Sequence, residues 1–464
     1  MKKKITFTKS LIASALALSA SYVNASAFQL AEVSSSGLGR AYAGEAAIAD
    51  NAAVVATNPA LMSLFKAKQF SWGGVYVDSN INVNGKIDVS TSPIPSSPDI
   101  LNVKANQKNI VPNTLIPNLY FVTPINDKFA IGAGMNMNFS LRSKYKDDYV
   151  GGVLGGTSEM DSINLNLSGS YRVSKGLSVG AGLNAIYAKA KFERRAGILK
   201  KTIDSLRSDD NELLILLSPS IVSSAYSLTF HENSTVARLQ DNNAWGLGWN
   251  IGAVYEFNQD NRIGIAYHSK VDIDFKDNDT LGYILGKEEI KLHRAKGKLT
   301  LHLPSYFEIS GFHQLTAKFA MHYSYKYTQW SRLQSLHAAY SNGEVAFHKD
   351  ENFHDSSRVA LGATYDVNDK LTLRAGIAYD ESADHPTASI PDTDRTWYSL
   401  GATYHFTPNL SVDMGFAHLR GKKQKFKENH SFTSKDNYEV GRIDADYQST
   451  ARANLYGLNL NYRF

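Results

Sequence analysis

The chain has 464 residues, no cysteine and a formal net charge of +5. Its first 25 residues contain four lysines and no acidic residue, and an apolar stretch at 11–20 leads to a small-residue cleavage pattern at Ala25. These features predict a secretory signal peptide over residues 1–25. Removing it leaves a charge of +1, five minus four, which argues against nucleic-acid binding. The lack of cysteine excludes disulfides and thiolate metal sites, and no later apolar run approaches the roughly 18 residues of a membrane helix.

The segment after the leader, residues 26–67, shows no regular alternation and is rich in alanine, glycine and serine. Its small residues, together with Leu38, Ile48, Leu61, Met62 and Phe65, could pack compactly inside a lumen. We therefore interpret it as a plug, and the alternative is a periplasmic extension.

From residue 68 to residue 464 the chain repeats a two-residue period, which is clearest between Phe129 and Arg142. Apolar side chains occupy every second position there, with small or polar ones between them. Because successive side chains of a strand point to opposite faces, the pattern predicts one apolar and one polar face. The same period recurs around Leu165, Trp249 and Tyr323. Such strands are typical of a transmembrane barrel with lipid outside and a polar lumen.

The connections between these strands alternate in length. Short ones are expected at 124–127, 174–176, 258–261, 313–315, 367–369 and 407–409, and long ones at about 78–111, 143–159, 193–240, 277–295, 328–354, 381–395 and 421–448. Thirteen connections give about fourteen strands, and short periplasmic turns are the rule in bacterial barrels. The predicted fold is all-β: a transmembrane antiparallel β-barrel of about 14 strands with an N-terminal plug in its lumen. Both termini would lie in the periplasm, and the aromatic Phe464 suits the membrane interface.

No enzyme motif fits its context. Gly176-Leu-Ser178-Val-Gly180 has the letters of a nucleophile elbow, but it lies within an alternating strand rather than a strand-to-helix turn. The four aspartates between residues 272 and 279 are better explained as a solvated strand end than as a cation site. We expect no enzymatic activity, no metal and no cofactor.

Several blocks of sequence occur in a fixed order. They are Phe28-Gln-Leu, Ser34-Ser-Ser-Gly-Leu-Gly-Arg-Ala-Tyr42, Gly44-Glu, Ala49-Asp50, Asn58-Pro59-Ala60, Asn164-Leu-Asn-Leu-Ser-Gly169, Tyr187-Ala-Lys-Ala-Lys-Phe-Glu-Arg194, Trp245-Gly-Leu-Gly-Trp-Asn250, Ile390-Pro-Asp-Thr-Asp-Arg395 and the final Phe464. Together they resemble the FadL-type outer-membrane long-chain fatty acid transporters over nearly the whole mature chain. The resemblance implies that the plug is the family's hatch, that an outer hydrophobic groove leads to an inner pocket, and that the substrate leaves sideways through the wall.

The resemblance also implies roles for two cationic residues. Arg194 matches the family's carboxylate-binding arginine, and Lys349 matches its second cationic contact. A guanidinium can hold a carboxylate through two parallel hydrogen bonds. The alternatives are that Arg194 pairs with Glu193 or is solvated at the rim, and that Lys349 is solvated or bound to lipopolysaccharide. Arg195 stands where the family usually has an apolar residue.

Other residues are candidates for the hatch and its gating. The resemblance gives Asp380 a part in holding the hatch, and an ion pair with Arg374 on the same lumen face is the alternative. Phe28 and Asn58-Pro59-Ala60 belong to the hatch, although Asn before Pro favours a turn in any protein. The apolar residues Leu214, Leu216 and Leu217 are expected to contact an acyl tail, or else to pack against other outer loops.

These observations predict passive uptake of long-chain fatty acids and similar hydrophobic molecules across the bacterial outer membrane. The fatty acid would bind in an apolar pocket, its carboxylate held by cationic side chains, and hatch rearrangement would release it laterally. The rival hypotheses are a channel for aromatic hydrocarbons and an adhesin or receptor that uses the long outer loops. The expected partners are the hydrophobic substrate, outer-membrane lipid and lipopolysaccharide. We expect no nucleic acid, and a monomer.

Overall fold

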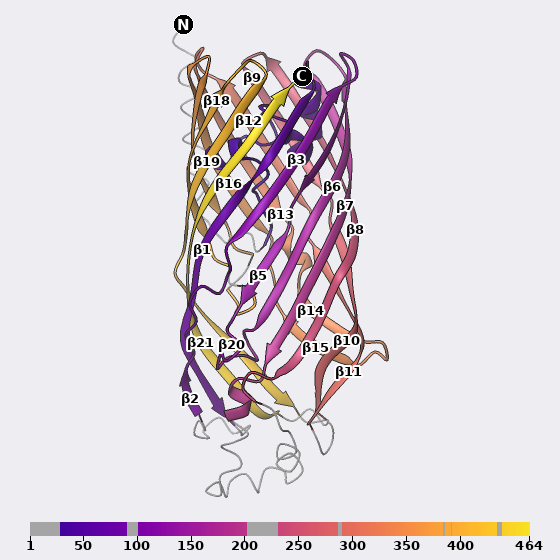
Figure 1. Cartoon of the computed structure of the whole chain (residues 1–464), viewed down its shortest axis with the longest axis vertical. Helices are drawn as coiled ribbons and strands as arrows, with labels where there is room; N and C mark the ends of the chain where they lie inside the picture. The colour runs from indigo at the N-terminus through magenta and orange to yellow at the C-terminus, as the bar shows by residue number, and fades with distance from the viewer. Residues whose placement is uncertain are drawn as a thin grey trace, which may run out of the picture.

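The computed structural model describes residues 28–90, 101–201, 231–285, 290–383, 386–390, 392–433 and 439–464. The predicted signal peptide, residues 1–25, and the apolar loop residues Leu214, Leu216 and Leu217 lie outside the described residues. The described chain forms a tall barrel whose strands are tilted from its long axis (Figure 1).

The wall is a closed antiparallel barrel of 14 strands, as the sequence predicts, and β1 pairs with β21 to close it. In chain order the wall strands are β1 (Gln69–Ser90), β3 (Thr114–Pro124), β4 (Phe129–Asn136), β6 (Thr157–Arg172), β7 (Leu177–Arg195), β8 (Thr235–Asn258), β9 (Asn261–His268), β12 (Tyr306–Gln314), β13 (Phe319–Thr328), β16 (Ser356–Asn368), β17 (Leu371–Asp380), β18 (Arg395–His405), β19 (Leu410–Gly421) and β21 (Glu439–Arg463).

Seven further strands extend the wall on the side of the long connections. They are β2 (Leu101–Lys104), β5 (Ser140–Lys144), β10 (Val271–Leu285), β11 (Ile290–Leu303), β14 (Ser335–Tyr340), β15 (Val345–Asp350) and β20 (Gln424–Thr433). The short turns lie at the opposite end, together with the C-terminus and the start of β1, where Gln69 pairs with Arg463 (Figure 1). Short turns of bacterial barrels face the periplasm, so the long connections face the outside of the cell.

The apolar face of the strands points outward, into the lipid. Leu167, Leu183 and Leu247 on three neighbouring strands are 65%, 70% and 80% exposed. The alternate residues point into the lumen, where the Asn166 amide donates to Asn184 (2.9 Å) and to Asn250 (3.1 Å). None of the helices in the described part of the chain is long and apolar enough to cross a membrane. The two faces therefore have the polarity that lipid outside and a packed polar lumen require.

The segment before β1 fills the lumen near the periplasmic end (Figure 1). It contains the short helices α2 (Ser35–Gly39), α3 (Val54–Thr57) and η1 (Pro59–Leu64); another, η2 (Trp330–Arg332), follows β13. Its backbone is hydrogen-bonded to distant wall strands: Gly44 N–H donates to Ser324 Oγ (2.7 Å), and Ala46 N–H donates to Ser310 Oγ (3.1 Å). The predicted plug is thus confirmed, and we call residues 28–65 the hatch.

Two lumen-facing glycines let the hatch come close to the wall. A Cβ on Gly264 would overlap the carbonyl oxygen of Ala46, and a Cβ on Gly252 would overlap the side-chain oxygen of Asn58. In the space left by the glycines, the Asn58 amide donates to the Ala46 carbonyl (2.7 Å) and to the wall carbonyl of Ile265 (3.2 Å). Asn58 Oδ1 also accepts from Ala60 N–H at 3.0 Å, which fixes the predicted Asn58-Pro59-Ala60 turn.

This close fit predicts that Gly264→Val will push the hatch off the wall without unfolding the barrel, because the strand ladder does not need the hatch. The permeability of cells or proteoliposomes to small solutes should rise, while the heat-modifiable mobility of the folded barrel should persist. Gly169→Val is the matched control, since a Cβ on Gly169 would have nothing within 4 Å. A tightly closed Gly264→Val channel would contradict this account of the packing.

Candidate substrate-binding site

Arg194 and Lys349 lie side by side although 155 positions separate them in sequence, 349 minus 194. Both donate to the hydroxyl of Ser389, which lies between β17 and β18: Arg194 Nη2 at 2.6 Å and Lys349 Nζ at 2.8 Å. Arg194 is at the end of β7 and Lys349 is on β15. The structure therefore brings the two predicted cationic residues to one place.

Strand parity directs Arg194 inward. On β7, Asn184, Ile186 and Phe192 share its face and are buried, whereas the exposed Lys189 lies on the opposite face. The pairing of Arg194 with the Glu193 carboxylate does not occur: that carboxylate pairs with Arg195 (2.6 Å) and Lys191 (3.3 Å). Arg194 instead donates to the Glu193 backbone carbonyl (2.9 Å). Arg195 points the other way, so the two adjacent arginines have different surroundings.

Arg194 is a buried cation whose described partners are all uncharged. It is 5% exposed, and besides Ser389 it donates to Ser158 Oγ (3.2 Å) and the Thr157 carbonyl (3.3 Å). Its guanidinium carbon lies 3.9 Å from the centre of the Phe192 ring, and it forms no salt bridge with any described residue. A buried charge without a counterion is costly, so a bound anion would be stabilised here.

Burial also acts on the ionisation of the site. Arg194 lies beyond Lys189, where the outer face of β7 turns from apolar to charged, and hence beyond the membrane-spanning part. Burial lowers the pKa of Arg194 to about 10, although the Glu428 carboxylate opposes the shift. Arg194 is therefore charged at neutral pH and able to attract a carboxylate.

Lys349 is held by two carboxylates rather than being a freely solvated loop residue. Its ammonium lies 3.1 Å from Glu428 Oε1 and 3.7 Å from Glu351 Oε1. Burial raises the pKa of Glu351, and the charge of Lys349 opposes that rise. Glu428 Oε1 also accepts from Ala388 N–H (2.9 Å), so it positions the segment that carries Ser389.

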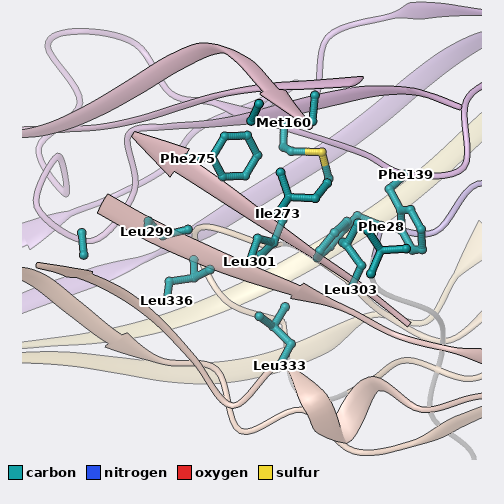
Figure 2. Packing of buried hydrophobic residues seen from close by; sticks show 14 of the residues in the cluster. Phe28, Phe139, Met160, Ile273, Phe275, Leu299, Leu301, Leu303, Leu333 and Leu336 are labelled. Carbon is teal, nitrogen blue, oxygen red and sulfur yellow. The ribbon is translucent and has the colours of Figure 1, made fainter. Parts of the chain in front are cut away.

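An apolar cluster adjoins these charges. Ile390, directly after Ser389, is buried in it, and Phe347 packs against it while stacking on Phe192 at 4.0 Å. Figure 2 shows part of the cluster, in which Phe28 of the hatch lies beside Phe139. The labelled members are Phe28, Phe139, Met160, Ile273, Phe275, Leu299, Leu301, Leu303, Leu333 and Leu336. A cationic pair beside an apolar interior matches the two ends of an amphipathic molecule.

Asp380 points into the lumen as predicted, but its partners are Arg358 and Arg395, at 2.5 Å and 3.0 Å, and the Trp397 indole N–H, at 2.6 Å. The alternative of an ion pair with Arg374 is wrong. Six residues along one strand span roughly 20 Å at about 3.3 Å per residue, too far for an ion pair. Arg358 and Arg395 are instead its direct neighbours across the strand ladder.

Asp380 reaches the hatch through Arg358, which donates to the Ala41 carbonyl at 2.8 Å. A second link was not foreseen: Asp50 of the hatch lies 3.4 Å from Arg374 of the wall and 2.8 Å from Arg40. The signal for it was the presence of charged residues inside otherwise small and apolar hatch blocks. The Asp50–Arg374 ion pair and the Arg358–Ala41 hydrogen bond attach the hatch to the wall.

The first hatch residues lie at a break in the wall. Phe28 packs against Trp330 at 4.8 Å and Phe139 at 6.3 Å. Gln29 forms an isolated β-bridge with Phe139, between the ends of β4 and β5. Phe28 is therefore part of the apolar cluster and lies beside the interrupted strand.

A plugged, lipid-facing barrel with an inner amphipathic site defines an outer-membrane transport protein. The comparisons with known proteins agree: the model of the family described as "Outer membrane protein transport protein (OMPP1/FadL/TodX)" matches residues 16–464. The chain belongs to this family of outer-membrane transporters for hydrophobic molecules, whose members are transporters or channels rather than enzymes.

Similar proteins include "Outer membrane protein P1" of Haemophilus influenzae, 57% identical over the full length of both chains. "Long-chain fatty acid transport protein" of Escherichia coli (strain K12) is 39% identical, again over the full length of both. Among solved structures, a FadL homologue of Pseudomonas aeruginosa has a TM-score of 0.72 at 23% identity, covering 94% of this chain and 100% of that one. The P. putida toluene transporter TodX has a TM-score of 0.59 at 17% identity, covering 90% and 95%.

Proposed function

We propose that this chain takes up long-chain fatty acids, with the carboxylate bound by Arg194 and Lys349 and the acyl chain in the adjoining apolar cluster. The observation that carries the proposal is the buried Arg194 guanidinium, which has uncharged partners only among the described residues. A carboxylate that replaced the Ser389 hydroxyl would give Arg194 a charged acceptor and Lys349 a further one. Hydrogen bonds to charged groups contribute about 1.5–3 kcal/mol each.

The apolar cluster supports a long aliphatic tail. Each buried methylene contributes about 0.8 kcal/mol, so a long acyl chain would gain binding energy along its whole length. An aromatic hydrocarbon could use the same cluster, but it has no anionic group and would leave Arg194 with uncharged hydrogen-bond acceptors only. The relatives named for fatty acids and the solved toluene transporter share the fold, so the fold alone does not distinguish the two substrates. The cationic pair is the feature that favours the fatty acid.

The break in the wall supports lateral release. β3 pairs with β4 only at residues 119–124, and residues 114–118 have no partner on β4 or β5 in the described chain. The hatch bonds at the interruption: Leu30 N–H donates to the Asn138 carbonyl (2.9 Å), and Ser140 N–H donates to the Phe28 carbonyl (3.1 Å). Movement of the hatch would release these bonds and open the interrupted wall towards the membrane.

The head-group assignment predicts that Arg194→Ala weakens binding of a fatty acid by roughly tenfold to a hundredfold. An uncharged alcohol of the same chain length should lose little affinity, because only the carboxylate forms a charge-assisted pair. Binding of the two ligands to purified protein is the measurement. Arg195→Ala is the matched control, since Arg195 pairs with Glu193 and Asp147 and does not face the cluster.

Lys349→Ala should act in the same direction as Arg194→Ala, and the double variant should show coupling if both residues hold one carboxylate. Equal losses for acid and alcohol would mean that Arg194 shapes the pocket rather than binding the head group.

The lateral route predicts that a disulfide between Gln29→Cys and Phe139→Cys will block uptake. The flanking hydrogen bonds make these residues a non-hydrogen-bonded antiparallel pair, with a typical Cα separation of about 4.5 Å, within the disulfide range of about 4.4–6.8 Å. The chain has no native cysteine to interfere. Fatty-acid uptake should be lost on oxidation and return on reduction, with Phe139→Cys alone as the control. Undiminished uptake by the oxidised channel would show that this part of the hatch need not move.

A further inference from the structure

A basic groove lies on the outer surface of the extracellular wall, between β10, β11 and β14. Its volume is about 680 Å³. Its lining has four lysine and arginine side chains against one carboxylate, that of Asp277, a net charge of four minus one, or +3. The cations are Lys276, Lys296, Lys298 and Arg332, and the side chains of His302 and His337 also line the groove.

In the protein without a bound anion, two of these lysines repel each other. Lys276 and Lys298 are direct partners in the β10–β11 register, and both are exposed on the outer face. Like charges directly opposite each other destabilise a sheet. Lys298 has a counterion in Asp274 at 2.9 Å. Lys276 and Lys296 form no ion pair with any described residue, and the charge of Lys276 acts only at longer range on Asp274. An anion between the strands would remove this repulsion.

The acidic residues nearby are already engaged. Asp277 accepts from the backbone N–H groups of Gln240 and Asp279, each at 2.9 Å. Asp272 contacts His302 (2.6 Å) and Arg332 (3.1 Å). Lys276 and Lys296, at the positive end of the groove, are therefore exposed and have no ion-pair partner among the described residues.

The position of the groove points to its ligand. β10 follows β9, whose Ile265 is exposed on the lipid-facing surface, as is Trp249 on the neighbouring β8. The groove lies beyond that apolar band, on the side of the long connections, where we expect the outer-leaflet head groups. Behind it, the apolar cluster with Ile273, Leu299 and Leu301 closes the way to the lumen.

We propose that this groove binds the phosphate groups of lipopolysaccharide in the outer leaflet. Ammonium groups act as point charges for phosphate, and three lysines on adjacent strands present them on one surface. The site is separate from the inner substrate site, because its lysine side chains are exposed on the face of β10 and β11 opposite to Ile273 and Leu299 of the apolar cluster.

The test compares the wild type with two double variants. The groove variant is Lys276→Gln/Lys296→Gln. The control variant, Lys425→Gln/Lys427→Gln, removes the same charge from the exposed face of β20. Lipopolysaccharide affinity should fall about tenfold or more in the groove variant and stay near wild type in the control. Enzymatically dephosphorylated lipopolysaccharide should bind wild type as weakly as the intact lipid binds the groove variant. Inorganic phosphate should compete only weakly.

Thermal unfolding in lipid-free detergent supplies a second measurement, since the groove variant loses a repulsion and should be at least as stable as wild type. Equal lipopolysaccharide affinity in wild type and groove variant, equal binding of the dephosphorylated lipid, or competition by free phosphate as strong as by the lipid would each overturn the proposal. A groove variant that melts earlier without lipid would overturn its premise.

Discussion

The structure depends on one constraint: a strand that crosses the lipid bilayer must pair all of its backbone N–H and C=O groups within the protein. The β1–β21 ladder from Gln69 to Ser90 meets this constraint by closing the sheet on itself. Closure then creates a second requirement, because a barrel of this size encloses a lumen wide enough to conduct water unless something fills it. The hatch fills it, and it comes closest to the wall at the lumen-facing glycines Gly252 and Gly264.

The lumen above and below the hatch differs in character: charged and polar contacts hold the hatch, and an apolar cluster lies on its extracellular side. Polar contacts, the Asp50–Arg374 ion pair and the Arg358–Ala41 hydrogen bond attach the hatch to the wall. In the extracellular half, the interior becomes apolar around Phe28, and the cations Arg194 and Lys349 lie at its margin. A molecule with a carboxylate and a long tail finds both parts in one place, and the first hatch residues contact the far side of the same cluster. Binding and hatch movement can therefore be linked through Phe28.

Most of the fold could be predicted because the residues of a barrel strand alternate between the lipid-facing and the lumen-facing side, so their polarity alternates along the sequence. The alternation between Phe129 and Arg142, the short turns and the small residues of the hatch were sufficient for strand number, topology and plug. Contacts across strands could not be predicted in the same way, because parity fixes the face of a residue but not its neighbour. Asp380 shows this: its face was correct, but its partner is Arg358, which depends on the register of β16 and β17. The meeting of Arg194 and Lys349 depends on long connections, and only the family resemblance suggested it.

The most direct test of the account is uptake of radiolabelled oleate by cells that lack their own transporter and express this chain, with toluene uptake measured in parallel. The account predicts oleate uptake above the empty-vector level, strongly reduced by Arg194→Ala/Lys349→Ala, with toluene entry unaffected by those substitutions. Oleate uptake that equals the empty-vector control, or that does not change in the double variant, would contradict the claim that the buried cationic pair selects a fatty acid.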